Sequence, residues 1–380
     1  MGLPPFNPYQ FVPFSEKVPR FAVNWPGHDR AESKSFRSGR AICEMRLETP
    51  ILVANAATEP HGLPAASLRG MVRTVAEIAG QGCASFIGED GTGWLKDKRD
   101  GVVSRTVGAH TANPGQRACD LVAPNSGEIA EAERDARPIN WRKLYLCRTC
   151  GMFGFALEQA CWRGRVRFED ARMHGRFEPY RPDSHEPLFP LYSPEPHHLP
   201  YYFSDPDPTP YHEDGDDRVY QGTKMAGRKV YVHHDPTHRV AADPNVGTKY
   251  VANKKCWFSF AVHFENLYPS ELGLLLFALD LKRTGGPANL RHHYGYGKPA
   301  GYGSVRILVT KCLLDQEGWY EGFDEPPTTA DADLDTYKTM FFGKRRPEGP
   351  DWAAFEKWMM YPRPGEVRYP TLEEIHGGEE

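Results

Sequence analysis

Hydrophobic residues recur along the chain with two different periods. In four segments they occupy every second position, which is typical of half-buried strands: 39–53, 164–170, 258–264 and 304–309. In two segments they recur at every third or fourth position, which predicts helices that begin at capping serines, Ser67 and Ser270, and end near residues 79 and 281. The order strand, helix, strand, strand, helix, strand predicts an α+β domain with a ferredoxin-like split βαβ sheet.

Two long segments lack such periodicity. Residues 83–141 are polar and contain glycine, and residues 172–228 are crowded with Pro, His, Tyr and Asp. We interpret the first as an insertion with little regular structure and the second as an irregular excursion that includes a protruding hairpin. The predicted organisation is a core over 1–311 that carries both segments, followed by a C-terminal extension over 312–380.

Composition is that of an ordinary globular protein, with 380 residues, of which 40% are hydrophobic and 25% charged. The longest apolar stretch, 272–279, is interrupted by Gly273 and is too short to span a bilayer. The N-terminus has neither the basic start nor the apolar block of a signal peptide, so we expect a cytoplasmic protein with no membrane partner. In that compartment the eight cysteines are not expected to form a disulfide framework.

The formal charge of −4 averages two different regions. Residues 312–380 contain 7 Lys and Arg against 16 Asp and Glu, whereas residues 281–311 contain six basic residues and no acidic one. The basic stretch is a candidate surface for a polyanion, and the alternative is an ordinary solvated face.

A glycine-rich loop lies inside the basic stretch. Residues 294–304 read YGYGKPAGYGS, in which four glycines allow close approach of a ligand to the backbone, Lys298 supplies charge and the tyrosines offer stacking faces. The loop is not a Walker phosphate loop, because the Gly-Lys-Ser/Thr order is missing and a strand, not a helix, follows. A purely structural turn is the alternative; the flanking basic residues favour a phosphate backbone as the ligand.

Several motifs carry a resemblance to a known family. Residues 62–73, GLPAASLRGMVR, look like the "(I)PGSSL(K/R)G-x-x-R" signature of the RAMP superfamily, the repeat-associated RNA-binding proteins of CRISPR systems. Further similar segments follow in the family's order: 152–154, 164–171 and 295–305. Others resemble one Cas-seven-like backbone branch found at type III-D-related or type VII loci: 11–13, 28–30, 227–231 with 233–234, and 264–267.

The resemblance implies a crRNA-binding backbone subunit with a modified RRM-like core. Such a subunit repeats along the guide in a class 1 effector and presents it for pairing with target RNA in antiviral defence. The implied partners are crRNA, target RNA, copies of the chain itself, a capping RAMP subunit, and a separate nuclease or the large type III subunit. The alternative from another class is a single-copy capping adaptor whose acidic C-terminal extension docks a partner.

Phosphate contacts position RNA without reading its sequence, which suits a protein that coats variable guides. The resemblance and the residue chemistry predict RNA contacts from Ser67, Arg69, Arg73, His28, Arg30, Arg228, Lys229, Tyr296, Lys298, Tyr302 and Ser304. The family's Gly-Ser pair is Ala65-Ala66 here, so Ser67 alone remains to cap the helix. In the family a thumb-like hairpin wedges between target bases, and 172–228 offers Tyr201, Tyr202, Phe203 or Tyr211 for that role.

The sequence contains few candidates for catalytic residues. Target-cleaving type III backbone subunits carry an aspartate in a long loop before the first helix, whereas residues 51–61 form a shorter loop without aspartate. Glu59 with His61, or Asp29 with His28, are the remaining acid/base candidates. We expect a separate nuclease to cut, and the alternative is that this chain is a target-RNA-cleaving endoribonuclease.

Cys147 and Cys150 have the two-residue spacing that lets two thiolates reach one tetrahedral zinc ion. Cys119 and Cys161 are the nearest further ligands, and Cys83 or His110 could replace one of them. We therefore predict a structural zinc knuckle, and the alternative is a pair of ordinary thiols.

Overall fold

The computed structural model describes residues 8–14, 19, 21–22, 36–53, 62–82, 93–96, 103–107, 145–156, 161–175, 211–214, 217–221, 227–236, 250–252, 255–315, 328–343 and 349–362. Within these residues, no helix has both the length and the apolar character needed to cross a membrane.

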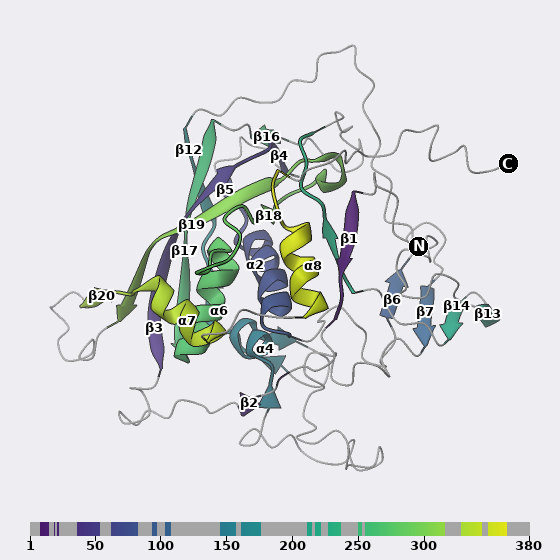
Figure 1. Ribbon diagram of the computed structural model, residues 1–380, viewed down its shortest axis with the longest axis horizontal. Coiled ribbons are helices and arrows are strands. Elements are labelled where there is room, and N and C mark those ends of the chain that lie inside the picture. The colour runs from purple at the N-terminus through teal and green to yellow at the C-terminus, as the bar shows by residue number, and fades with distance from the viewer. Residues whose placement is uncertain are drawn as a thin grey trace.

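An eight-stranded antiparallel sheet forms the centre of the molecule (Figure 1). Its four long strands follow the order β19 (Ser304–Asp315), β3 (Arg37–Leu47), β17 (Cys256–Leu267) and β12 (Ala171–Gly175). The shorter strands β18 (His292–His293) and β20 (Thr329–Asp331) pair with β19, β11 (Val166–Phe168) pairs with β17, and β5 (Gly62–Leu63) pairs with β12. β17 thus separates β3 from β12, as a split βαβ arrangement requires, and the mixed α/β architecture is confirmed.

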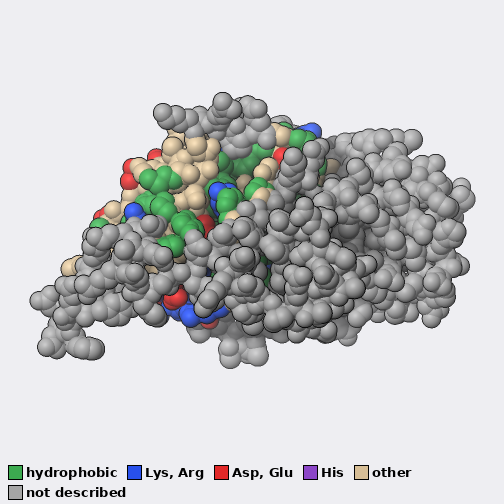
Figure 2. Space-filling model, turned by 90° about the horizontal axis from the view of Figure 1, so that it is seen from below, with side chains coloured by type: hydrophobic (Ala, Val, Ile, Leu, Met, Phe, Trp, Pro, Cys, Tyr) green, Lys and Arg blue, Asp and Glu red, His purple; other side chains and the backbone are tan. Residues whose placement is uncertain are grey.

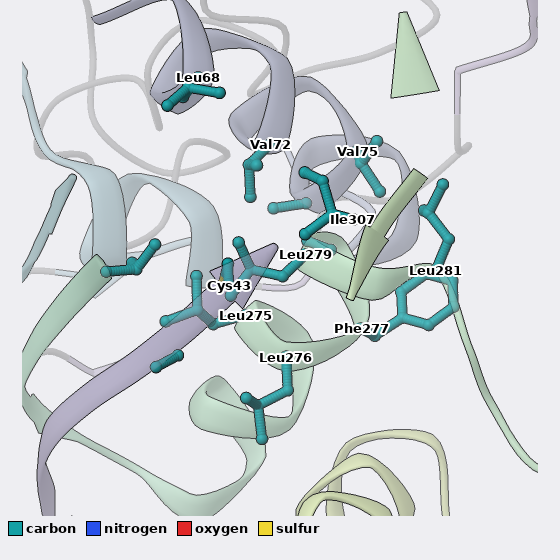
Figure 3. Packing of buried hydrophobic residues seen from close by; sticks show 14 of the residues in the cluster. Cys43, Leu68, Val72, Val75, Leu275, Leu276, Phe277, Leu279, Leu281 and Ile307 are labelled. Carbon is teal, nitrogen blue, oxygen red and sulfur yellow. The ribbon is translucent and has the colours of Figure 1, made fainter. Parts of the chain in front are cut away.

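Helices α2 (Ala65–Ala79) and α6 (Pro269–Asp280) cover one face of this sheet. Figure 3 shows Leu68, Val72 and Val75 of α2 facing the side chains of α6, with Cys43 and Ile307 reaching them from the sheet. α6 is buried around its whole circumference, because α7 (Leu334–Phe342) and α8 (Pro350–Trp358) pack on its outer side. A helix that is apolar all round is stable only in such a position.

The C-terminal helices are part of this core. Trp352 and Phe355 contact the ring of Phe277, and Lys338 forms a buried ion pair with Asp280 (Nζ–Oδ2 2.6 Å). β19 also runs across residue 311. The boundary between the core and a C-terminal extension stays a prediction, but the described part of 328–362 packs on α6 and the sheet.

Both helices begin differently from the prediction. α2 starts at Ala65, and the Asp170 side chain accepts a hydrogen bond from Ala65 N (2.7 Å), so Ser67 lies in the first turn and does not cap the helix. α6 starts at Pro269, where Glu271 accepts from Tyr268 N (2.9 Å). Proline is favoured in the first turn because it has no N–H to leave unpaired, so Ser270 is not a cap either.

Short pairings surround the core. A four-stranded sheet joins β6 (Gly93–Lys96), β7 (Val103–Val107), β14 (Asp217–Gln221) and β13 (Tyr211–Asp214). Within segment 83–141 the structure describes the two short strands β6 and β7, and the expectation that the insertion has little regular structure stays a prediction. Within 172–228, β13 and β14 pair as an antiparallel hairpin, and the thumb-like excursion as a whole stays a prediction.

Four further pairs hold loops against the core: β1 (Tyr9–Val12) with β15 (Arg228–Tyr231), β2 (Phe21–Ala22) with β8 (Tyr145–Leu146), β4 (Ile51–Val53) with β16 (Tyr250–Ala252), and β9 (Phe155–Ala156) with β10 (Cys161–Trp162). Figure 2 shows one side of the molecule, where Lys/Arg and Asp/Glu side chains of the described surface are interspersed with hydrophobic ones. Charge alone does not mark a binding site on that side.

Candidate nucleic-acid interface

A cavity of about 600 Å³ opens between α2, the glycine-rich loop and β15. α2 lines it with one face, formed by residues three and four apart: Ser67, Gly70, Met71 and Thr74. The opposite walls come from residues 229–231 and 292–296, with Lys298 at their side. The helix and the loop that the sequence singled out therefore meet in one place.

A hydrogen bond joins the helix to the loop. The Ser67 hydroxyl bonds to the Tyr294 phenol, and burial raises the pKa of Tyr294 to about 12, so this tyrosine is neutral at physiological pH. Ser67 is able to make this contact because Asp170 caps the helix in its place.

The glycines of the loop lie close to other parts of the protein, as expected for a structural turn, and approach of a ligand to the loop stays a prediction. Gly295, Gly297, Gly301 and Gly303 all have left-handed φ values between 75° and 89°. A Cβ on Gly303 would lie 2.1 Å from Tyr294 O, and one on Gly295 would lie 2.5 Å from Leu52 O. These contacts hold the loop against β4, where Tyr296 N donates to Leu52 O (3.0 Å).

Two lysines and a tyrosine form the charged wall of the cavity. Lys229 Nζ lies 5.4 Å and Lys298 Nζ 5.9 Å from the centre of the Tyr231 ring, and Lys229 Nζ lies 3.9 Å from that of Tyr9. Burial lowers the pKa of Lys298 and lowers that of Lys229 to about 8, so Lys229 is still mostly protonated at pH 7. No carboxylate is among the described residues of the lining.

Buried histidines support this wall. His293 lines the cavity and stacks on His233 (centroids 3.8 Å apart, planes at 4°), and burial lowers the pKa of both rings, that of His233 to about 3. His233 is held by the Ser304 hydroxyl (Nδ1–Oγ 2.8 Å) and by Arg291 O (3.0 Å). Ser304 and Tyr302 are buried behind the lining, where they position the loop.

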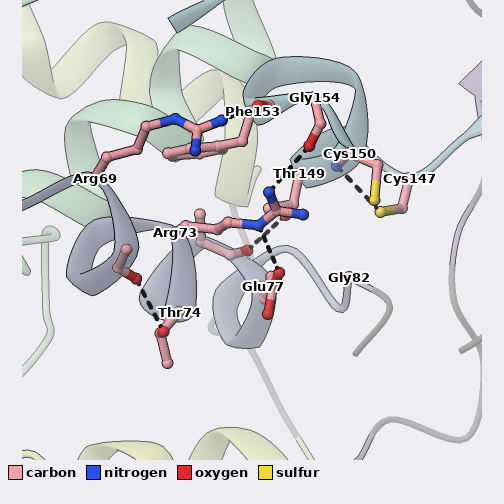
Figure 4. Close-up of polar contacts among 12 residues, drawn as sticks. Arg69, Arg73, Thr74, Glu77, Gly82, Cys147, Thr149, Cys150, Phe153 and Gly154 are labelled. Atoms are coloured by element: carbon pink, nitrogen blue, oxygen red, sulfur yellow. Dashed lines mark hydrogen bonds and ion pairs between the residues drawn. The ribbon is translucent and has the colours of Figure 1, made fainter. Parts of the chain in front are cut away.

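The arginines predicted to grip phosphate are not among the described residues of the lining, and Figure 4 shows Arg69 and Arg73 directed toward Phe153 and Gly154. Arg69 donates to Phe153 O, and Arg73 donates to Gly154 O (3.0 Å) and pairs with Glu77 (Nε–Oε1 2.9 Å). Arg228, only 5% exposed, pairs with the other Glu77 oxygen (2.6 Å). These contacts give the three arginines a structural role in the described fold, and RNA contacts by them stay a prediction.

Several predicted residues lie outside the described part of the chain. These are His28 and Arg30 of the RNA-binding set, the acid/base candidates Asp29, Glu59 and His61, and the zinc-ligand candidate Cys119. Conversely, Tyr231, His293, Met71 and Thr74 line the cavity but were not predicted. Alternation within β15 is the signal that was missed, because it places Lys229 and Tyr231 on one face and buries Arg228 and Val230 on the other.

The cysteine pair opens a short helix, α4 (Arg148–Phe153). Both thiols are buried, and Cys147 Sγ accepts a hydrogen bond from Cys150 N (3.4 Å), so Cys147 caps the helix (Figure 4). Cys161 follows shortly after in β10, where only its backbone is described. The described side chains contain no group of three or more potential metal ligands, and the zinc knuckle stays a prediction.

The protein thus has an α+β fold and a cavity that is lined by two lysines and by tyrosine and histidine rings. The family model of the RAMP superfamily matches residues 44–306, which is more than half of the chain, so this chain belongs to the RAMP superfamily. The family resemblance seen in the sequence is thereby confirmed.

Two solved structures are similar at low identity. The crystal structure of Thermofilum pendens Csc2 has 13% identity and a TM-score of 0.33, and the match covers 88% of this chain and 80% of that chain. A chain of a Type IV-B CRISPR complex has 12% identity and a TM-score of 0.28, with 76% and 95% covered. No curated protein sequence matches significantly.

Proposed function

We propose that this chain is a CRISPR-associated RNA-binding subunit that holds guide RNA in the cavity beside α2 and presents it for pairing with target RNA. The observation that carries the proposal is the convergence of Ser67, Lys229 and Lys298 on one cavity that has no described carboxylate. The ammonium groups neutralise phosphates whatever the base, and the rings of Tyr231 and Tyr296 provide stacking faces.

The proposed arrangement is a backbone of several copies along one guide, with a capping RAMP subunit and a separate nuclease. What supports it is membership of the RAMP superfamily together with the backbone-branch motifs of the sequence. The short 51–61 loop without aspartate favours a binding role over RNA cleavage. Counting copies of the chain per crRNA in the purified complex distinguishes the backbone subunit from a single-copy adaptor.

Replacing both cavity lysines tests the RNA site. We expect Lys229→Ala/Lys298→Ala to weaken binding of a guide-length single-stranded RNA about ten- to a hundredfold at low salt, and to reduce the slope of log K against log[salt] by about 1.4, since each phosphate contact on a single strand contributes about 0.7. Lys282→Ala is the matched control, because Lys282 is exposed at the end of α6 outside the cavity. Equal affinity and slope in the double variant and the control would refute the proposed site.

We also propose that Cys147 and Cys150 bind structural zinc together with Cys161 and Cys119. The support is the two-residue spacing of the first two thiols at the start of α4, where Cys147 Sγ accepts a hydrogen bond from Cys150 N. Metal analysis of the purified protein is expected to give about one equivalent of zinc, as for other four-ligand structural sites, and Cys147→Ser to lose it, whereas Cys256→Ser retains it because Cys256 is buried in β17. Zinc far below one equivalent in the unchanged protein would reject the site.

A further inference from the structure

The face of the sheet that α2 and α6 leave uncovered carries its own set of side chains. Along β17, Phe258, Phe260 and Val262 are buried beneath the helices, and the alternating residues Trp257 and Ser259 point to the opposite face, where they are half-buried. Figure 1 shows α2, α6 and α8 on the same side of the sheet. The uncovered face is therefore separated from the cavity by the helix layer and the sheet itself.

Strand register aligns four residues across this face. His174 of β12 is opposite Trp257 of β17, Trp257 is opposite Arg46 of β3, and Arg46 is opposite Arg306 of β19. Residues that are directly opposite in antiparallel strands project to the same face. The four side chains thus form one row across the central strands, which spans about 14 Å at the usual strand spacing.

The aromatic half of the row is rigid. The His174 and Trp257 rings are stacked, with centroids 4.1 Å apart and planes at 15°. His174 Nε2 also bonds to Ser259 Oγ (2.6 Å), which fixes the imidazole. A fixed, partly exposed pair of ring planes offers stacking to a base at little cost in side-chain entropy.

The other half of the row is positively charged. The Arg46 side chain is 65% exposed. Arg172 is exposed two residues before His174 in β12, so it projects to the same face of the sheet. Neither Arg172 nor Arg306 forms an ion pair with a described residue. Glu44 is the acidic neighbour in this patch, and its contact with Arg46 (3.2 Å) is exposed and therefore weak. Three arginines against one glutamate leave the patch net positive.

We propose that the row His174–Trp257–Arg46–Arg306 is a second binding site for single-stranded RNA, distinct from the cavity. The aromatic pair stacks on bases and the two arginines contact the neighbouring phosphates, a combination that four-stranded RNA-binding sheets use. A hydrophobic protein partner would match the ring pair but would leave Arg46 and Arg306 without counter-charges, so the charge pattern selects RNA. With sites on both sides of the sheet, one chain contacts two separate RNA segments.

The experiment uses the Lys229→Ala/Lys298→Ala variant of the full chain, so that the cavity contributes little, and a fluorescent 12-nucleotide oligouridine as the probe. We expect residual binding, which Trp257→Ala reduces about ten- to a hundredfold, as loss of base–aromatic stacking does. Arg46→Gln/Arg306→Gln is expected to reduce the salt slope by about 1.4. His263→Ala is the control, since His263 lies on the same face of β17 but outside the row.

A second measurement remains valid if Trp257→Ala is poorly folded. RNA binding is expected to quench tryptophan fluorescence in the parent and clearly less in Trp257→Phe, which keeps an aromatic ring. The proposal is overturned if the arginine pair and both Trp257 variants bind oligouridine as the parent does, or if removal of the cavity lysines abolishes all binding. If the lysine change has no effect while Trp257→Ala does, the cavity proposal fails and the sheet site stands.

Discussion

The two sides of helix α2 carry polar residues with different tasks. On one side Ser67 and Thr74 face a cavity whose charge comes from lysines on other elements, Lys229 and Lys298. On the other side Arg69 and Arg73 donate to the carbonyl oxygens of Phe153 and Gly154 in and next to α4. The helix thus lines the cavity on one side and holds α4 and the residue after it on the other.

The two sides of α2 differ because burial removes water from the charged groups on the arginine side. A buried guanidinium needs acceptors and a counter-charge, and Glu77 together with the backbone oxygens of Gly154 and Gly82 accepts hydrogen bonds from Arg73 and Arg228. The cavity lysines have ring faces beside them, and the described residues of the lining include no carboxylate. The groups that surround each charged side chain, and not the number of charged residues, therefore distinguish the two sides of α2.

The largest expected effect on stability comes from removing the carboxylate that pairs with the buried arginines. Glu77→Gln leaves Arg73 and Arg228 buried without their counter-charge, and we expect a loss of about 3–5 kcal/mol in the free energy of unfolding. Chemical denaturation measures this loss. The folded fraction should bind RNA with nearly unchanged affinity, because Glu77 does not line the cavity.

An exposed ion pair serves as the comparison for Glu77. Glu265→Gln removes the partner of Arg163, where both side chains are more than half exposed, and is expected to cost less than about 1 kcal/mol. Similar losses for the two variants would show that the Glu77 cluster is not a stabilising anchor.

A glycine substitution tests whether the glycine-rich loop positions the residues that line the cavity. Gly303→Ala places a Cβ 2.1 Å from Tyr294 O at a left-handed φ of 88°, and we expect a cost of about 1–3 kcal/mol together with weaker RNA binding, since Tyr294 and Tyr296 must shift. Gly285→Ala has a similar φ of 69° but open space around the Cβ, so it should cost about 1 kcal/mol and leave RNA affinity unchanged. Unchanged RNA affinity in Gly303→Ala would show that the conformation of the loop does not contribute to RNA binding.

Much of the fold follows from local patterns. The alternation in 258–264 and the helical spacing in 67–79 correspond to β17 and α2, because their neighbours bury one face of each. Contacts between distant segments are not visible in such patterns. Gly273 looks like a weak point in its helix, yet a Cβ there would lie 2.0 Å from Tyr337 O, so glycine allows α7 to pack closely on α6.

The candidate site was also predicted only in part, because local motifs are visible in the sequence and contacts between distant segments are not. The loop tyrosines and Lys298 form a compact motif, and Ser67 belongs to a family signature, so sequence alone points to both segments. Which arginines are buried depends on Glu77 and on backbone oxygens of another helix, more than 70 residues from α2 in the case of Phe153. No spacing rule within one segment contains that information.

The smallest expected effect is a pH dependence of RNA binding that sharpens the contrast between lysine and arginine. Burial lowers the pKa of Lys229 to about 8, so raising the pH from 7 to 8.5 removes its charge in the free protein and weakens binding by up to about fourfold. Lys229→Arg keeps its charge over this range, and its RNA affinity should therefore change much less with pH. Binding isotherms of both proteins with an oligoadenosine probe at pH 7.0, 7.75 and 8.5 measure the difference. Parallel pH profiles would mean that protonated Lys229 does not contact the phosphates, and the charge of the cavity would then rest on Lys298.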